Sequence, residues 1–281
     1  MHYRHHYHAG NFADVFKHAL LIELLRALSR KASPWCYVDT HAGAGRYGLG
    51  ERAERTGEWA AGVGRLREAT NLSPALEALR ERLGGTVALA AYPGSPWIAA
   101  GLARSGDRLI LCETVPEVAD ELRQEMRNAP QAAGVTIALH RRDGYEALPA
   151  LTPPPEKRGL VLIDPPFERS DEFEAMEAAI LASQARWSGG VYAAWYPVKQ
   201  RYPADRFRRR LQRALPGVPL LDARLDTGAP SEGQMHACGL LVLNPPWQFD
   251  QAAGPLLTEL ARLLACSPRA EASLDWITPA R

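Results

Sequence analysis

The chain lacks several features that mark specialised protein classes. It has no apolar run of membrane-spanning length and no apolar signal-peptide core at its N-terminus, so we expect a cytoplasmic protein without a membrane partner. Its four cysteines show no metal-ligand spacing, and we expect no metal site. Three of these cysteines lie inside apolar runs, which predicts buried free thiols in place of disulfides.

Lysine is scarce, because Lys17, Lys31, Lys157 and Lys199 are the only lysines and the other basic residues are arginines. Arginine suits bidentate contacts with phosphate and stacks on bases. A GC-rich genome enriches arginine as well, and the formal charge of +1 excludes a strongly basic polyelectrolyte binder. The charge balance therefore does not decide for or against nucleic acid.

Apolar runs alternate with amphipathic stretches along the 281 residues, and 46% of the chain is hydrophobic. This alternation predicts a single α/β domain over residues 1–281, Rossmann-like, with a mostly parallel seven-stranded sheet. The last two strands, 220–226 and 237–243, are expected to form a hairpin that makes the last strand antiparallel. The other expected strands are 35–40, 108–113, 135–140, 159–164 and 189–195, and the expected helices are 14–30, 116–128, 144–151 and 171–186.

The connection after the first strand is unusually long. Residues 51–92 are rich in Arg and Glu and carry helical signals at 57–68 and 74–83. We interpret them as a helical insertion within the domain, since long insertions in compact domains are often functional.

A glycine-rich loop follows the first expected strand. Residues 43–48 read Gly-Ala-Gly-Arg-Tyr-Gly, in which Gly43 and Gly45 open a literal G-x-G-x-x-G pattern. Glycines let the backbone turn tightly and approach a ligand. The pattern alone fits a nicotinamide-dependent oxidoreductase, an S-adenosylmethionine (SAM) enzyme or a structural turn.

Two acidic residues follow the next two expected strands. Glu113 is placed to accept hydrogen bonds from ribose hydroxyls, and Asp143 is placed to meet an adenine ring or its amine. Either acid alone is explained by a solvated turn or a helix cap. Both acids and the glycine loop, at successive strand ends, favour an adenosine-binding site.

The pattern Asp/Asn-Pro-Pro-aromatic occurs twice, at Asp164–Phe167 and Asn244–Trp247. A carboxylate and a proline carbonyl accept hydrogen bonds from an exocyclic amine, and the aromatic ring stacks on an extruded base. The first copy ends a parallel strand and would face the same crevice as the glycine loop and both acids. The second copy ends the antiparallel strand, so we expect it at the opposite edge, as a structural turn with Trp247 packed against a helix.

With these motifs the chain resembles class I SAM-dependent methyltransferases of the N6-adenine type. It resembles more closely the RlmJ family, which methylates an adenine N6 in 23S rRNA. The motifs that carry the resemblance are YRHHYHAGNFADVFKH at 3–18, DTHAGAGRY at 39–47, ERTGE at 54–58, YPGSP at 92–96, LIDPPFE at 162–168 and WYPV at 195–198.

The resemblance implies a set of site residues. The SAM-contacting positions are Lys17, His18, His41, Ser95, Glu113, Asp143, Gly144 and Asp164. Asp164 is also the catalytic position, with Pro165 and Phe167 beside the substrate base, and Tyr3 matches a tyrosine that acts on the RNA. Phe167 stands where many relatives carry Tyr, which preserves stacking and removes any role for a hydroxyl. Ser95 alone is equally well explained as a helix N-cap.

The expected partner is 23S rRNA before full ribosome assembly, acted on by a monomer. Arg206, Arg210 and Arg213 share one helical face and are placed to follow phosphates, although a solvated face explains them equally well. Three alternatives remain open: a DNA adenine-N6 methyltransferase, a nicotinamide-dependent oxidoreductase, and a non-catalytic RNA-binding module. The choice of RNA over DNA comes from the resemblance alone.

Overall fold

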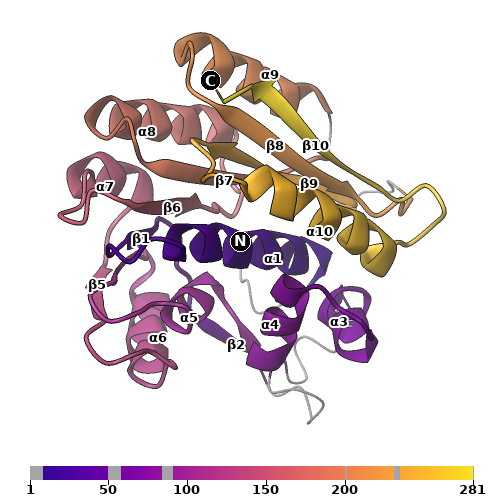
Figure 1. The fold of residues 1–281 in the computed structure, drawn as a ribbon, viewed down its shortest axis with the longest axis horizontal. Coiled ribbons are helices and arrows are strands. Elements are labelled where there is room, and N and C mark those ends of the chain that lie inside the picture. The colour runs from indigo at the N-terminus through magenta and orange to yellow at the C-terminus, as the bar shows by residue number, and fades with distance from the viewer. Residues whose placement is uncertain (1–8, 50–57, 84–90, 200, 231–234, 281) are drawn as a thin grey trace.

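The computed structural model describes residues 9–49, 58–83, 91–199, 201–230 and 235–280. Its centre is an eight-stranded sheet in the order β10-β8-β9-β7-β6-β1-β4-β5 (Figure 1). The strands are β1 (Cys36–Asp39), β4 (Arg108–Cys112), β5 (Thr136–His140), β6 (Gly159–Ile163), β7 (Val191–Pro197), β8 (Leu220–Asp226), β9 (Ala237–Leu243) and β10 (Glu271–Thr278). The seven strands expected from the sequence are all present, and the Rossmann-like α/β fold is confirmed.

The direction of each strand follows from its pairing. β1 pairs in parallel with β4 and β6, and β5 and β7 extend the parallel part. β9 lies between β7 and β8 and is antiparallel to both, as the expected hairpin requires. The strand β10, which was not expected from the sequence, pairs antiparallel with β8 at the edge of the sheet. Its residues are only half-buried, so it lacks the apolar run of an inner strand.

Helices cover both faces of the sheet. One face carries α1 (Phe12–Ser29), α4 (Pro74–Arg82), α5 (Ser95–Ala100), α6 (Pro116–Arg127) and α10 (Phe249–Leu264), and the other carries α7 (Gly144–Leu151), α8 (Glu172–Arg186) and α9 (Arg201–Ala214). Cys36, Cys112 and Cys238 are buried and Cys266 is exposed, all as free thiols. No helix within the described ranges is long and apolar enough to cross a membrane.

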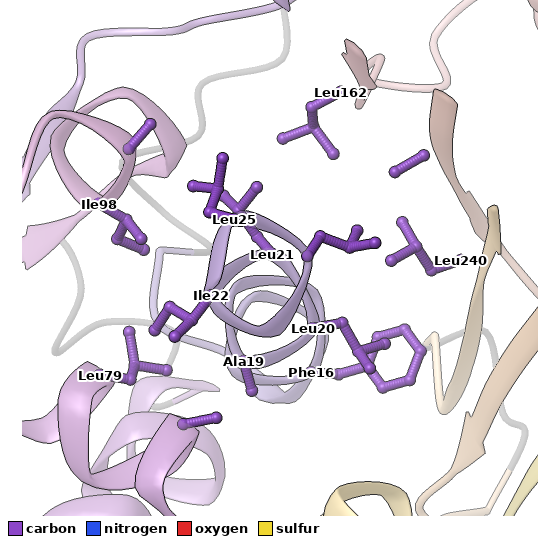
Figure 2. Packing of buried hydrophobic residues seen from close by; sticks show 14 of the residues in the cluster. Phe16, Ala19, Leu20, Leu21, Ile22, Leu25, Leu79, Ile98, Leu162 and Leu240 are labelled. Atoms are coloured by element: carbon purple, nitrogen blue, oxygen red, sulfur yellow. The ribbon is translucent and has the colours of Figure 1, made fainter. Parts of the chain in front are cut away.

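The helix α1 is the centre of the larger core. Asn11 caps it by accepting hydrogen bonds from the backbone N–H groups of Ala13 and Asp14, so it starts two residues before the expected position. Its buried side chains lie toward Leu162 and Leu240 of the sheet on one side and toward Leu79 and Ile98 on the other (Figure 2). This central position carries Lys17 and His18 into the protein interior.

The long connection after β1 is helical where the sequence predicts it. Residues 58–68 are helical, ending in η2 (Ala60–Gly64) and α3 (Arg65–Glu68), and α4 follows. A two-stranded ladder of β2 (Arg46–Gly48) and β3 (Ala91–Pro93) joins the two ends of the connection. Its helices pack against α1 and α10, so it contributes to the core of the domain.

Candidate active site

The parallel strands β1, β4, β5 and β6 end at one edge of the sheet, and polar side chains follow each of them. A cavity at this edge is lined by Thr40, His41, Glu113, Thr114, Asp143 and Gly144. Four of these residues were expected at the site from the sequence. Ligands of open α/β sheets collect at this edge, which makes the cavity the candidate site.

The glycine loop is fastened to Glu113. Gly43 N donates to Glu113 Oε2 at 3.0 Å, and Oε1 accepts from Val115 N at 2.9 Å. Gly43 has a φ of +60°, and a Cβ there would lie 2.0 Å from the Tyr47 hydroxyl oxygen, so only glycine fits. Burial raises the pKa of the Glu113 carboxyl. Each carboxylate oxygen has a further lone pair, so Glu113 keeps the capacity to accept from a ligand.

Asp143 caps the helix α7. Its Oδ1 accepts from Tyr145 N at 2.8 Å and Glu146 N at 3.1 Å, so the helix-cap explanation holds for this residue. The two donors share one oxygen, and Asp143 also lines the cavity. A Cβ on Gly144 would lie 1.9 Å from Thr40 O, so glycine lets the start of α7 approach the end of β1 directly.

Lys17 contacts the first Asp-Pro-Pro-Phe segment itself. Its Nζ lies 2.5 Å from Asp164 Oδ2 and 3.0 Å from Asp14 Oδ1. Burial favours a lower pKa for this ammonium, but the two carboxylates outweigh burial and raise the pKa above its ordinary value. Nζ also lies 5.7 Å from the Trp195 ring centroid. Asp14 and Trp195 were not expected at the site, because only the docking of α1 on the sheet brings them to Lys17.

His18 and Ser95 each form a hydrogen bond with another buried side chain. His18 Nδ1 lies 2.7 Å from the Tyr92 hydroxyl. Ser95 Oγ donates to Asp39 Oδ2 at 2.7 Å, and Gly94 is the N-cap of α5. The N-cap explanation of Ser95 is therefore wrong, since its hydroxyl faces the end of β1.

Asp39 and His41, separated by Thr40, are two ionisable groups with opposite pKa shifts. Burial raises the pKa of Asp39 to about 6, although hydrogen bonds from Ser95 and Tyr37 lower it. Burial lowers the pKa of His41 to about 4, although Asp164 and Asp143 raise it. His41 is therefore a neutral imidazole at pH 7, with Nδ1 2.8 Å from Thr40 Oγ1. The sequence analysis missed Asp39, which the DTHAGAGRY motif contains.

The raised pKa of Asp39 gives a pH-dependent prediction. The pKa of Asp39 is about 6 in the folded protein, compared with its ordinary value of 3.8 in the unfolded chain. Ionising Asp39 therefore lowers the free energy of unfolding as pH rises through that window. Asp39→Asn mimics the neutral acid and escapes this loss. Relative to the unsubstituted protein, it is expected to gain about 2 kcal/mol between pH 4 and pH 7. Denaturant unfolding at both pH values measures the gain, and a constant difference would contradict it.

The first Asp-Pro-Pro-Phe segment leaves β6 at the carboxyl edge. Pro165 is buried, Pro166 is exposed, and Phe167 adopts a left-handed backbone with a φ of 51°. The Phe167 ring makes edge contacts with Trp195 at 5.8 Å and Phe173 at 5.1 Å between centroids. Phe167 thus packs against the buried residues on both faces of the sheet. It is also part of an aromatic row that continues into α8.

The second copy lies at the opposite edge, as expected. Asn244 Nδ2 donates to Ser188 O at 2.8 Å and to Gly190 O at 2.9 Å, in the turn before β7 begins. Asn244 is therefore a structural residue. The expected packing of Trp247 against a helix is wrong, because its side chain is 81% exposed.

Several other expected residues lie away from the cavity. A Cβ on Gly45 would meet Leu122 at 2.9 Å, and its carbonyl accepts from Gly94 N, so this glycine serves chain packing. Arg210 is paired with Glu177 at 2.7 Å. Tyr3 lies outside the described residues, as do residues 54–57. Within the described ranges, no group of three or more His, Cys, Asp or Glu side chains is arranged to hold a metal ion.

Comparisons with known proteins place these observations in a family. The family model described as "Ribosomal RNA large subunit methyltransferase D, RlmJ" matches residues 32–278. Proteins named ribosomal RNA large subunit methyltransferase J are 38% identical in Escherichia coli and 37% identical in Haemophilus influenzae, each over 99% of both chains. A crystal structure of a Legionella pneumophila protein, 32% identical, covers 96% of this chain and 98% of its own with a TM-score of 0.85.

Proposed function

The chain belongs to the RlmJ family of ribosomal RNA large subunit methyltransferases, and on that premise we propose that its carboxyl-edge site transfers a methyl group from SAM to the N6 amine of an adenine in 23S rRNA. The observation that carries the proposal is the position of Asp164. It opens the Asp-Pro-Pro-Phe segment at the end of β6, on the same edge as Glu113 and Asp143.

The donor set at the edge fits SAM. Glu113 and Asp143 line the cavity and supply carboxylate oxygens for ribose hydroxyls and for an adenine amine. Gly43 and Gly144 let the loop after β1 and the start of α7 pack closely at this edge. When bound, SAM supplies a methyl group on a positively charged sulfur. The residues proposed to hold it are Lys17, His18, His41, Gly43, Ser95, Glu113, Asp143, Gly144 and Asp164, whereas Gly45 packs against α6.

Asp164 is the proposed catalytic residue. An adenine amine is a weak nucleophile, because its lone pair is delocalised into the ring. Lys17 binds Asp164 Oδ2, and no hydrogen bond within the described ranges involves Oδ1. We propose that Oδ1 contacts the N6 amine of the target adenine. Oδ1 would accept a hydrogen bond from the amine, stabilise the positive charge that develops on the nitrogen and take its proton. The Pro165 carbonyl is proposed as a second acceptor, with Phe167 and Tyr3 contacting the base.

Removing the proposed ribose acceptor has a measurable consequence. Glu113→Ala is expected to weaken SAM binding about ten- to hundredfold, because a hydrogen bond to a charged group contributes about 1.5–3 kcal/mol. Titration calorimetry measures this affinity. Glu117→Ala, which removes an exposed carboxylate from the first turn of α6, is the matched control and should bind SAM normally. Unchanged affinity in a folded Glu113→Ala protein would remove Glu113 from the site.

The substrate is tested by direct competition. The protein is incubated with methyl-labelled SAM and equal masses of deproteinised 23S rRNA and adenine-containing duplex DNA. The proposal predicts label in the rRNA. Label in the DNA alone would favour the DNA methyltransferase, and no label in either would favour a binding module. Binding of NAD in preference to SAM would favour the oxidoreductase.

A further inference from the structure

A second cavity lies next to the first Asp-Pro-Pro-Phe segment, between α8 and α9. Its volume is about 220 Å³, and it is lined by Phe173, Glu174 and Glu177 of α8, by Ser170, and by Tyr202, Pro203, Arg206, Phe207 and Arg210 of α9. The two helices pack against each other on the same face of the sheet (Figure 1). We call this cavity the α8–α9 groove. Pockets that hold drug-sized ligands are usually about 300–1,000 Å³, so the groove suits one planar ring system.

The groove continues directly from the active site. Both helices start at the carboxyl edge, because α8 follows the Asp-Pro-Pro-Phe segment and α9 follows β7. The floor residue Phe173 contacts Phe167 at 5.1 Å and Phe207 at 5.3 Å between ring centroids. An RNA strand with its target base at Asp164 would therefore carry a neighbouring nucleotide over this aromatic row.

The side chains of the groove match the parts of a nucleotide. Phe173 and Phe207 form an apolar floor, and Tyr202 stands at the rim with its side chain 74% exposed. An exposed tyrosine beside an apolar floor offers a base a surface to stack on. Glu174 and Glu177 offer acceptors for base amino groups.

The arginines of the groove divide into two kinds. Arg210 is held by Glu177 at 2.7 Å and Glu174 at 3.5 Å, so it forms a wall. Arg206 is exposed, and no ion pair within the described ranges includes it. Arg206 is thus the groove's cation for a phosphate, and Arg209 and Arg213 continue the exposed positive surface of α9. This charge complements RNA.

We propose that the α8–α9 groove binds an unpaired nucleotide adjacent to the target adenine, with its base against Tyr202 and its phosphate at Arg206. The inference rests on the proposed function, since it takes RNA as the substrate. It assigns Tyr202 and Arg206 to substrate binding, away from the reacting atoms and from the cofactor.

Equilibrium binding tests the groove apart from catalysis. Filter binding measures the affinity of the unsubstituted protein, Tyr202→Ala and Arg206→Ala for deproteinised 23S rRNA. Each substitution is expected to weaken binding about tenfold, because base–aromatic stacking and phosphate contacts each have effects of this order. SAM affinity and melting temperature should not change, since both side chains are exposed. Trp247→Ala and Arg127→Ala are the matched controls, because they remove exposed side chains away from the groove.

Two further measurements separate the base from the phosphate. Tyr202→Phe should keep the affinity, because the ring and not the hydroxyl stacks. Arg206→Ala should reduce the slope of log K against log salt by about one, and Tyr202→Ala should leave that slope unchanged. The proposal would be overturned if Tyr202→Ala and Arg206→Ala bound the rRNA as tightly as the unsubstituted protein, or if both control variants lost as much affinity. Methylation of the same rRNA by the unsubstituted protein reports on the proposed function independently.

Discussion

Asp164→Ala is expected to lower methyl transfer at least about a thousandfold, because it removes both the acceptor for the adenine amine and the group that takes its proton. A general base alone contributes about 10²–10⁴-fold to a rate, and electrostatic stabilisation of the developing charge adds to it. Transfer of labelled methyl groups to deproteinised 23S rRNA, measured under single-turnover conditions, gives the rate. Circular dichroism establishes that the variant is folded.

Asn244→Ala is the matched control for this prediction, because Asn244 opens the other copy of the motif. Its amide holds Ser188 O and Gly190 O at the far edge of the sheet, so the substitution is expected to cost about 1–3 kcal/mol of stability. Methyl transfer per folded molecule should remain near normal. Equal loss of activity in two equally folded variants would contradict the assignment of the active copy.

Lys17→Met is expected to lower the free energy of unfolding by about 3–5 kcal/mol, because it removes the buried cation that contacts both Asp14 and Asp164. Lys17 and Asp14 are almost fully buried, with 5% and 3% of their side chains exposed. Denaturant unfolding at pH 7 measures the loss. Adding Asp14→Asn to Lys17→Met should restore part of the stability, since one buried negative charge is removed and an amide oxygen still accepts from Gly10 N.

A surface ion pair on the same helix provides the comparison. Arg26 pairs with Glu23 at 3.2 Å and is 36% exposed, so Arg26→Met should change stability by no more than about 1 kcal/mol. Losses of similar size in Lys17→Met and Arg26→Met would show that Lys17 is not the counter-ion of a buried carboxylate pair.

The directions of the strands and the position of the first Asp-Pro-Pro-Phe segment were predictable, because both follow from local patterns. The apolar runs before Asp164 and Asn244 are alike, but only the first continues a strand-helix-strand series, and parallel strands must end at one edge. Because the hairpin makes β9 antiparallel, the second copy lies at the edge of the sheet opposite the candidate site. The half-exposed β10 was not predictable in this way, since its pairing with β8 and not its hydrophobicity makes it a strand.

The contacts within the site were less predictable, because they join residues far apart in the sequence. Lys17 meets Asp164 only because α1 crosses the sheet in the larger core. The N-cap explanation of Ser95 came from its place before an apolar helix, but its actual partner, Asp39, comes from β1. The burial of Trp247 was also predicted from its apolar neighbours in the sequence, but the residue is exposed. The sequence around an aromatic residue does not show whether another element packs over it.

The most direct test of the account is mass mapping of methylated fragments. Deproteinised 23S rRNA is incubated with SAM and either the unsubstituted protein or Asp164→Ala, and then digested and analysed by tandem mass spectrometry. The account predicts one fragment with an added methyl group on the N6 of an adenine, absent with Asp164→Ala. Methylation on another base or another atom, or an unchanged fragment with Asp164→Ala, would contradict it.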